Sequence, residues 1–176
     1  LGEPDSPGNA FVHATAPSSL GSGHGLWLAG SGGVLDHLDP ESGQLDHRLY
    51  EACGSLFIIG VLEARDRSVW LGCQDQLVRF DPAAGSVRRW YADGSDDAAP
   101  PGRISQLVQQ RDGRLWVASH QAVQVRTPDG RVLDTIMRGD GRGLEATVLI
   151  EHMLTAPDGG IWVATSEGLL AWDDGA

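Results

Sequence analysis

The chain repeats one short unit four times: a turn followed by an apolar strand with tryptophan at its second position. The four tryptophans are Trp27, Trp70, Trp116 and Trp162, in the segments LWLA, VWLG, LWVA and IWVA, with spacings of 43, 46 and 46 residues. A period of about 45 residues with turn residues in each copy is typical of β-propeller blades. The repeat fills most of the 176 residues and therefore predicts one all-β domain.

An aspartate stands four residues before three of these tryptophans, and it indicates a tight turn between two strands. Asp112 and Asp158 are each followed by glycine, and Asp66 occupies the same position in the second copy. Asp-Gly between two apolar runs is a strong hairpin signal, so we predict type I′ turns with positive φ at Gly113 and Gly159.

A small residue follows each tryptophan at the second position after it. These residues are Ala29, Gly72, Ala118 and Ala164. A strand that is apolar on both faces must be covered on both faces, and small side chains allow neighbouring sheets to approach closely. We therefore expect each tryptophan to be buried between adjacent blades.

Two further strands complete each repeat. Third strands are expected at 34–39, 77–81, 123–127 and 169–173, and fourth strands at 45–50, 87–91 and 132–137. The blades then span about 11–50, 57–91, 103–137 and 148–176, with 1–10 as a linker or loop. Propellers close with about four to eight blades. The expected fold is three complete four-stranded antiparallel blades and most of a fourth, as part of a larger propeller.

The repeat resembles the two-component regulator propeller repeat. The resemblance is carried by an initial isoleucine, Asp-Gly, an apolar strand with tryptophan, a small residue with Thr or Ser, and Gly-Leu, as in PDGGIWVATSEGLLAWD after Ile150. The first copy departs from the pattern, with a longer loop and Gly30 in place of threonine. The resemblance implies a periplasmic or extracellular sensory module of a bacterial-type signalling protein, which binds a small molecule or a protein and is not itself an enzyme.

A weaker resemblance to streptogramin-lyase-like propellers supplies the alternative, a lyase or hydrolase with its site on a loop rim. The six histidines show no metal-ligand spacing, and no cofactor or metal is expected. A propeller site is nevertheless assembled from different blades. The sialidase Asp box does not fit, because its aspartate stands one residue further from the tryptophan.

Ligand-binding residues are expected on the rim that carries the blade-joining loops and the loops between second and third strands. Binding residues concentrate on loops held by a rigid scaffold. The candidates are His120, Gln121, Glu167, Asp75, Gln74 and Arg142, with His120 favoured because of the usual roles of imidazole.

The net charge of −11 and the lack of a basic stripe argue against a nucleic-acid partner. The expected partners are an unknown small molecule or protein, the remaining blades of a longer protein, or a second copy. Membrane attachment would require segments outside this sequence. The acidic run 93–97 lacks the closing glutamate of a calcium loop.

The two cysteines, Cys53 and Cys73, are expected on the same rim and have no zinc-binding spacing. They form either a disulfide or two separate buried thiols, and the sequence leaves both open.

Overall fold

The computed structural model describes residues 11–21 and 25–172, and these form four antiparallel sheets. The segment 1–10, expected as a linker or loop, lies outside the described residues. Three sheets have four strands and the last has three, each with its strands paired in chain order. The predicted all-β propeller class, with three complete blades and most of a fourth, is confirmed.

The strands of the first two blades and of the segment between them have the following bounds. Blade 1 contains β1 (Val12–Ser18), β2 (Gly25–Gly30), β3 (Leu35–Leu38) and β4 (Leu45–Leu49), with a short 3-10 turn, η1 (Ser31–Gly33), before β3. The strand β5 (Ala52–Ser55) lies in the connection to blade 2, where the sequence predicted a loop. Blade 2 contains β6 (Gly60–Glu63), β7 (Val69–Gly72), β8 (Gln76–Asp81) and β9 (Ser86–Tyr91).

The last two blades repeat this order. Blade 3 contains β10 (Ile104–Gln109), β11 (Leu115–Ser119), β12 (Ala122–Arg126) and β13 (Val132–Met137). Blade 4 contains β14 (Ile150–Thr155), β15 (Ile161–Thr165) and β16 (Gly168–Trp172).

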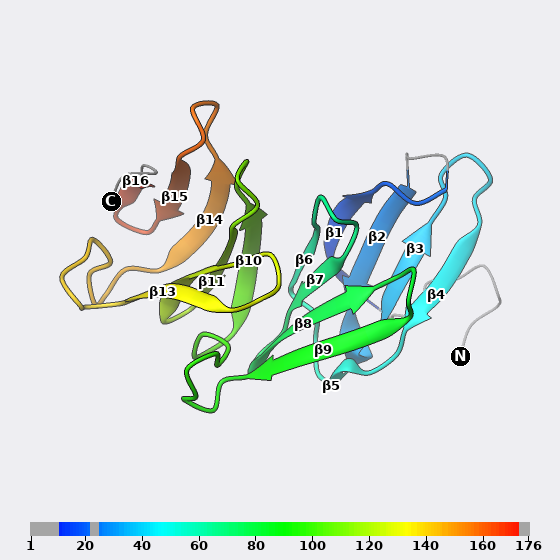
Figure 1. The fold of residues 1–176 in the computed structure, drawn as a ribbon, viewed down its shortest axis with the longest axis horizontal. Helices are drawn as coiled ribbons and strands as arrows, with labels where there is room; N and C mark the ends of the chain where they lie inside the picture. The colour runs from blue at the N-terminus through cyan, green and yellow to red at the C-terminus, as the bar shows by residue number, and fades with distance from the viewer. Residues whose placement is uncertain (1–10, 22–24, 173–176) are drawn as a thin grey trace.

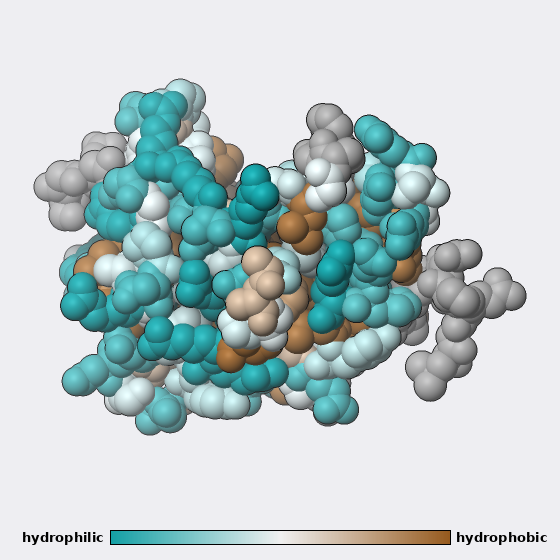
Figure 2. All heavy atoms as spheres, turned by 45° about the vertical axis from the view of Figure 1, so that its right-hand side comes forward, coloured by the Kyte–Doolittle hydropathy of each residue, from teal (hydrophilic) through white to brown (hydrophobic). Residues whose placement is uncertain are grey.

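The blades follow one another around a common axis, from β1–β4 on the right of Figure 1 to β14–β16 on the left. The first strands of successive blades lie side by side, β1 with β6, β6 with β10, and β10 with β14. No comparable contact joins the described strands of blade 1 to those of blade 4. In Figure 2 the visible face is mostly hydrophilic, with smaller apolar patches between the polar residues.

Each blade-to-blade interface is a separate apolar cluster. Trp27 and Leu35 of blade 1 pack with Ile58 and Leu71 of blade 2 and its connection. The next cluster contains Trp70 and Val117, and the third contains Trp116 and Met153. The small residues do allow close approach, because a Cβ atom on Gly72 would lie 2.7 Å from the carbonyl oxygen of Ile104 on blade 3.

The burial expected for the tryptophans holds for three of the four. The exposed fractions are 0% for Trp27, 1% for Trp70 and 7% for Trp116, but 42% for Trp162. The prediction for Trp162 is wrong because no described sheet covers the outer face of blade 4, where Leu154 and Leu169 are also exposed.

The hairpin turns have positive φ at the predicted glycines, but they are not type I′. The φ angle is 95° at Gly113 and 104° at Gly159, whereas Asp112 and Asp158 are not among the described residues with positive φ. Gly113 N donates to Gln110 O at 3.0 Å, and Gln110 N donates to Arg114 O at 2.9 Å. These bonds define a three-residue loop, a type I turn followed by a left-handed glycine.

The aspartate before the glycine has its own role in this turn. Its carboxylate accepts a hydrogen bond from the backbone N–H two residues later, at 2.9 Å from Arg114 N to Asp112 and at 3.1 Å from Gly160 N to Asp158. Short polar side chains favour turns through such bonds. The Asp-Gly pair therefore predicts the hairpin correctly and its turn type incorrectly.

The difference between the buried and the exposed tryptophans leads to a prediction about stability. Trp116→Ala should reduce the free energy of unfolding by about 3–5 kcal/mol, because it leaves a cavity between blades 3 and 4. Trp162→Ala should cost less than about 1 kcal/mol, as expected for a side chain outside a core. Urea denaturation of both variants checks this, and equal losses would contradict the assigned interfaces.

Candidate functional site

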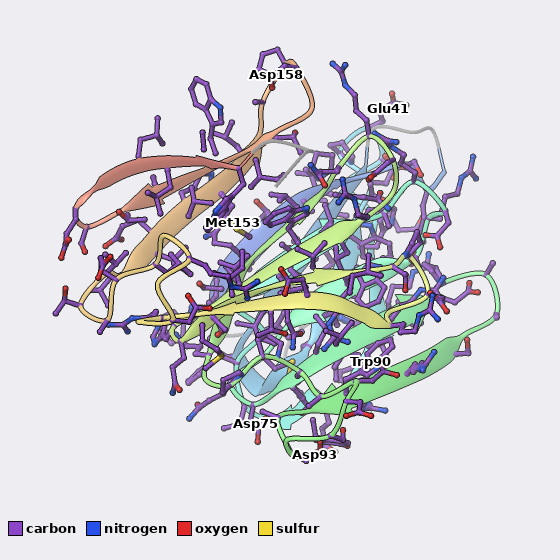
Figure 3. All side chains as sticks on the ribbon, turned by 60° about the vertical axis from the view of Figure 1, so that its left-hand side comes forward. Glu41, Asp75, Trp90, Asp93, Met153 and Asp158 are labelled. Carbon is purple, nitrogen blue, oxygen red and sulfur yellow. A yellow bond between two sulfur atoms is a disulfide. The ribbon has the colours of Figure 1, made fainter. Side chains whose placement is uncertain are left out.

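An open hollow lies between blades 2 and 3, at the ends of three strands. It has a volume of about 490 Å³ and is lined by Gln74, Asp75, Gly102, Arg103 and His120. These residues come from the β7–β8 loop, the β9–β10 connection and the β11–β12 loop. We call this site the rim hollow. In Figure 3, Asp75 and Asp93 lie at one end of the molecule, whereas Asp158, in a hairpin turn, and Glu41 lie at the other.

Backbone hydrogen bonds hold His120 at the edge of the hollow. Its N–H donates to Arg103 O at 3.1 Å, which joins the β11–β12 loop to the connection from blade 2. Its carbonyl oxygen accepts a bond from Nη1 of Arg138 at 2.9 Å. The same guanidinium donates to the carbonyl oxygen of Ala146, in the connection to blade 4.

A buried arginine of blade 3 fixes the connection that carries Gly102 and Arg103. Arg126 is fully buried, and its guanidinium donates to the carbonyl oxygens of Asp97 at 3.3 Å and of Ala98. Burial lowers the pKa of Arg126 to about 10, so the group remains charged at neutral pH. Nearer the hollow, Ser119 Oγ donates to Pro101 O at 2.7 Å.

The two cysteines are joined. Cys53 and Cys73 form a disulfide with a Cα–Cα distance of 5.8 Å, and both residues are buried. The sequence left open a disulfide or two separate thiols, and the structure shows the disulfide. The disulfide joins β5 to the end of β7, directly before Gln74, and Cys73 O also accepts a bond from Ile104 N at 2.8 Å.

The polar side chains that line the rim hollow have no bonding partners among the described residues. Within the described residues, no hydrogen bond or ion pair involves the side chains of Gln74, Asp75, Arg103 or His120. Burial, together with the positive charges of Arg103 and Arg138, holds the pKa of His120 below 6.5. The imidazole is therefore neutral at pH 7, with one nitrogen as donor and the other as acceptor.

The structure brings three of the six candidate residues into the hollow. Gln74, Asp75 and His120 line it, and Gln121 lies against Gly102 at its edge. Glu167 and Arg142 do not line it. Glu167 accepts a hydrogen bond from Thr147 Oγ1 at 2.9 Å, and Arg142 forms ion pairs with Asp134 and Asp140.

Sequence reasoning did not single out Arg103, Arg126 or Arg138. Arg103 lies in the connection between β9 and β10, where no sequence pattern distinguishes it from its polar neighbours. One signal for Arg126 was present, a charged residue in the otherwise largely apolar strand AVQVR. No local pattern marks Arg138, because its partners are backbone carbonyl oxygens.

Two kinds of feature are absent from the described residues. They contain no group of three or more His, Cys, Asp or Glu side chains placed to hold a metal ion. They also contain no helix with the length and apolar character needed to cross a bilayer.

Comparison with solved structures gives similar folds at low sequence identity. The extracellular domain of BT4673 from B. thetaiotaomicron, described as a one-component system, has a TM-score of 0.71 at 16% identity, over 96% of this chain and 22% of that one. A second structure of this domain, described as part of a hybrid two-component system, has a TM-score of 0.70 at 17% identity, over 94% and 22%. Virginiamycin B lyase from Staphylococcus aureus has a TM-score of 0.62 at 10% identity, over 93% and 60%.

The fold is that of a β-propeller. At these identities the likeness concerns the fold alone, and the chain spans about a fifth of the length of the BT4673 domain. No protein-family model matches the sequence. No curated protein matches it significantly.

The position of His120 leads to a prediction about pH. Because its folded pKa lies below its ordinary value of 6.5, lowering the pH through this range should protonate the unfolded chain first and decrease the free energy of unfolding. NMR titration should give a His120 pKa below 6.5, and Arg103→Gln should move it upward by removing a positive charge. A pKa at or above 6.5 in the unmodified chain would contradict this electrostatic description.

The disulfide leads to a second prediction. The two cysteines are 20 residues apart, and cross-linking a loop of this size stabilises a fold by about 3 kcal/mol. Reduction of the disulfide should therefore lower the urea concentration at which half of the protein is unfolded. The double variant Cys53→Ala, Cys73→Ala should have the same low midpoint with and without reductant. An unmodified chain with the same midpoint in both redox conditions would argue against the bridge.

Proposed function

We propose that this chain is the sensory part of an extracytoplasmic signalling protein, and that the rim hollow receives its ligand. The observation that carries the proposal is the convergence of four polar side chains, without partners in the described residues, on one hollow at the loop ends of two blades. Loops on a rigid scaffold are the usual place for binding residues.

Two further observations support the extracytoplasmic location. The Cys53–Cys73 disulfide fits an oxidising compartment, where such bonds form and persist. The structures of BT4673 with a similar fold are those of an extracellular domain of a signalling system. That role comes to this chain as part of the proposal.

The side chains of the hollow favour a small polar molecule with a carboxylate group. The Arg103 guanidinium can bind a carboxylate through two parallel hydrogen bonds. His120, neutral at pH 7, and the amide of Gln74 supply further donors and acceptors. The Asp75 carboxylate carries the opposite charge to Arg103 and suits an ammonium group of the same ligand. A free amino acid has both groups.

The test is a binding screen with the purified chain. Amino acids, dicarboxylic acids and neutral sugars form the three arms, and bound ligand is detected as a rise in Tm, since a ligand that binds only the folded state stabilises it. We expect a carboxylate-bearing compound to bind, and His120→Ala or Arg103→Gln to weaken its affinity at least tenfold. His152→Ala, an exposed histidine on β14, is the matched control and should leave the affinity unchanged.

Three outcomes would count against the proposal. A ligand whose affinity is the same in both hollow variants binds elsewhere. A neutral sugar that binds best would refute the role given to Arg103. Chemical conversion of a bound compound would favour the alternative, a lyase or hydrolase, for which virginiamycin B lyase provides a structural likeness.

A further inference from the structure

One wall of the rim hollow is the short loop between β7 and β8. It contains Gln74 and Asp75, the second of which is labelled in Figure 3, and it directly follows Cys73. Two backbone bonds close this loop, from Cys73 N to Gln76 O at 3.0 Å and from Ala92 N to Asp75 O at 3.0 Å. The position of the loop decides where this wall of the hollow stands.

The same loop recurs in blades 3 and 4, with a hydroxyl at the position of Cys73. Strand pairing places Cys73 at the position of Ser119 in blade 3 and of Thr165 in blade 4. Ser119 Oγ accepts bonds from Gln121 N at 3.2 Å and from Ala122 N at 3.1 Å. Thr165 Oγ1 accepts a bond from the backbone N–H two residues later, at 3.3 Å. In these blades the hydroxyl therefore caps the loop that follows it.

The hydroxyl of blade 3 also holds the loop to the preceding connection. Ser119 Oγ donates to Pro101 O at 2.7 Å, in the connection from blade 2. Cys73 has the matching attachment, because its disulfide joins it to Cys53 in the connection from blade 1. A disulfide sulfur has no proton to donate, and within the described residues no loop N–H bonds to the sulfur of Cys73. In blade 2 a covalent bond thus replaces the hydroxyl.

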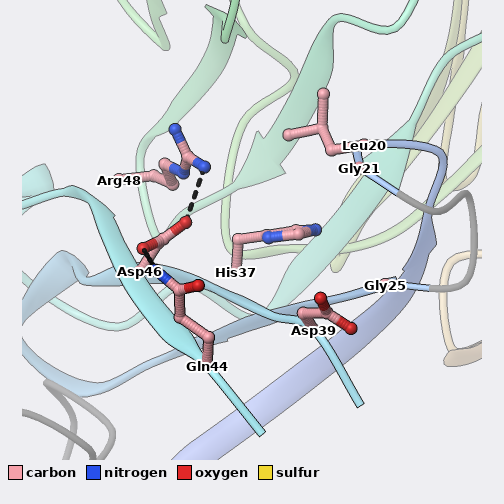
Figure 4. Close-up of a pocket in the computed structure, with 8 residues that line it drawn as sticks. All are labelled: Leu20, Gly21, Gly25, His37, Asp39, Gln44, Asp46 and Arg48. Carbon is pink, nitrogen blue, oxygen red and sulfur yellow. Dashed lines mark hydrogen bonds and ion pairs between the residues drawn. The ribbon is translucent and has the colours of Figure 1, made fainter. Parts of the chain in front are cut away.

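The polar side chains of this wall do not hold one another in place. Gln74 and Asp75 form no side-chain bond within the described residues. A pocket on blade 1 differs in this respect, because there Asp46 pairs with Arg48 at 2.8 Å and accepts a bond from the Gln44 amide at 3.2 Å (Figure 4). The wall of the rim hollow therefore depends on its backbone bonds and on the disulfide.

We propose that Cys73 is a positioning residue of the rim hollow, and that the hollow has its binding geometry only after the disulfide has formed. This role rests on the function proposed above, because it concerns the same hollow. Without the disulfide, Cys73 carries a thiol, which is a weak donor and a weak acceptor, so the loop has neither the covalent attachment nor the hydroxyl cap. The chain therefore acquires its site in an oxidising compartment and lacks it in a reducing one.

The bond forms by exchange with an external disulfide such as oxidised glutathione. The thiols of Cys53 and Cys73 give up two protons and two electrons and become one S–S bond, and the external disulfide takes up both and leaves as two thiols. The two residues are 1% and 0% exposed, in the cluster between blades 1 and 2. Because exchange requires contact between sulfur atoms, the redox state is set while the chain folds.

The first test measures amide hydrogen exchange by NMR in the oxidised chain and in a chain refolded from urea with dithiothreitol. The Ala92 amide reports on the wall through its bond to Asp75 O. The Arg138 amide is the matched control, since it donates to Gln121 O in the equivalent loop of blade 3, also at 3.0 Å. Reduction should raise the ratio of the Ala92 rate to the Arg138 rate at least about tenfold, as for a segment that opens locally.

Two double variants separate positioning from simple cross-linking. Both lack the bridge, but Cys53→Ala with Cys73→Ser supplies a hydroxyl that can accept the loop N–H groups as Ser119 does. Its exchange ratio should lie within about threefold of that of the oxidised chain, because the cap is restored. Cys53→Ala with Cys73→Ala should match the reduced chain. A cross-link with no positioning role would leave the two variants equal.

The second test adds glycine, which carries only a carboxylate and an ammonium group, and follows the ring resonances of His120. The oxidised chain and the serine variant should bind it at least about tenfold more tightly than the other two forms, because a wall that must first be ordered costs binding free energy.

Three results overturn the positioning role: equal exchange ratios in the oxidised and reduced chains, serine and alanine variants that behave alike, or a glycine affinity that is independent of the disulfide. Exchange ratios that differ as expected, with no glycine binding in any form, would support the role of Cys73 and refute the amino-acid ligand proposed above. The two proposals therefore fail in distinguishable ways.

Discussion

The structure depends on the burial of the apolar second strand of each repeat against a neighbouring sheet. Trp27 illustrates how the interface is completed, since its indole N–H donates to Glu63 of blade 2 at 2.6 Å. In blade 3 the indole of Trp116 donates to Gln110 at 2.7 Å, and the amide of Gln110 in turn donates to Gly159 O of blade 4 at 2.8 Å. The interfaces of blades 1 and 2 and of blades 3 and 4 therefore combine apolar packing with a hydrogen bond between adjacent blades.

Much of this architecture follows from the sequence because its signals are local. The tryptophan period, the Asp-Gly turns and the small residues each act within a few positions, and together they determine strand order and the rim on which each loop lies. The placement of His120, Gln74 and Asp75 on one rim is a consequence of that order. The burial of Trp162 could not be predicted in the same way, because it depends on whether another sheet covers blade 4.

Other features depend on contacts that leave no sequence pattern. Arg126 and Arg138 bind backbone carbonyl oxygens, which every residue possesses, so their partners cannot be identified from residue types. The same applies to Cys73, whose bond to Cys53 the sequence left open, because the distance between the two residues depends on the fold. The turn type was missed because an Asp-Gly pair suits both a two-residue and a three-residue hairpin loop.

The bonds around the rim hollow also bear on the ligand binding proposed for it. Arg126, Ser119 and the disulfide hold the walls before any ligand arrives, and a preformed site loses little conformational entropy on binding. Arg138 connects His120 to the backbone of Ala146, in the connection that leads to blade 4. In the proposed function, a ligand that moves His120 would therefore act on the guanidinium that also positions this connection, and the hydrogen bonds of Arg138 would carry the effect from blade 3 towards blade 4.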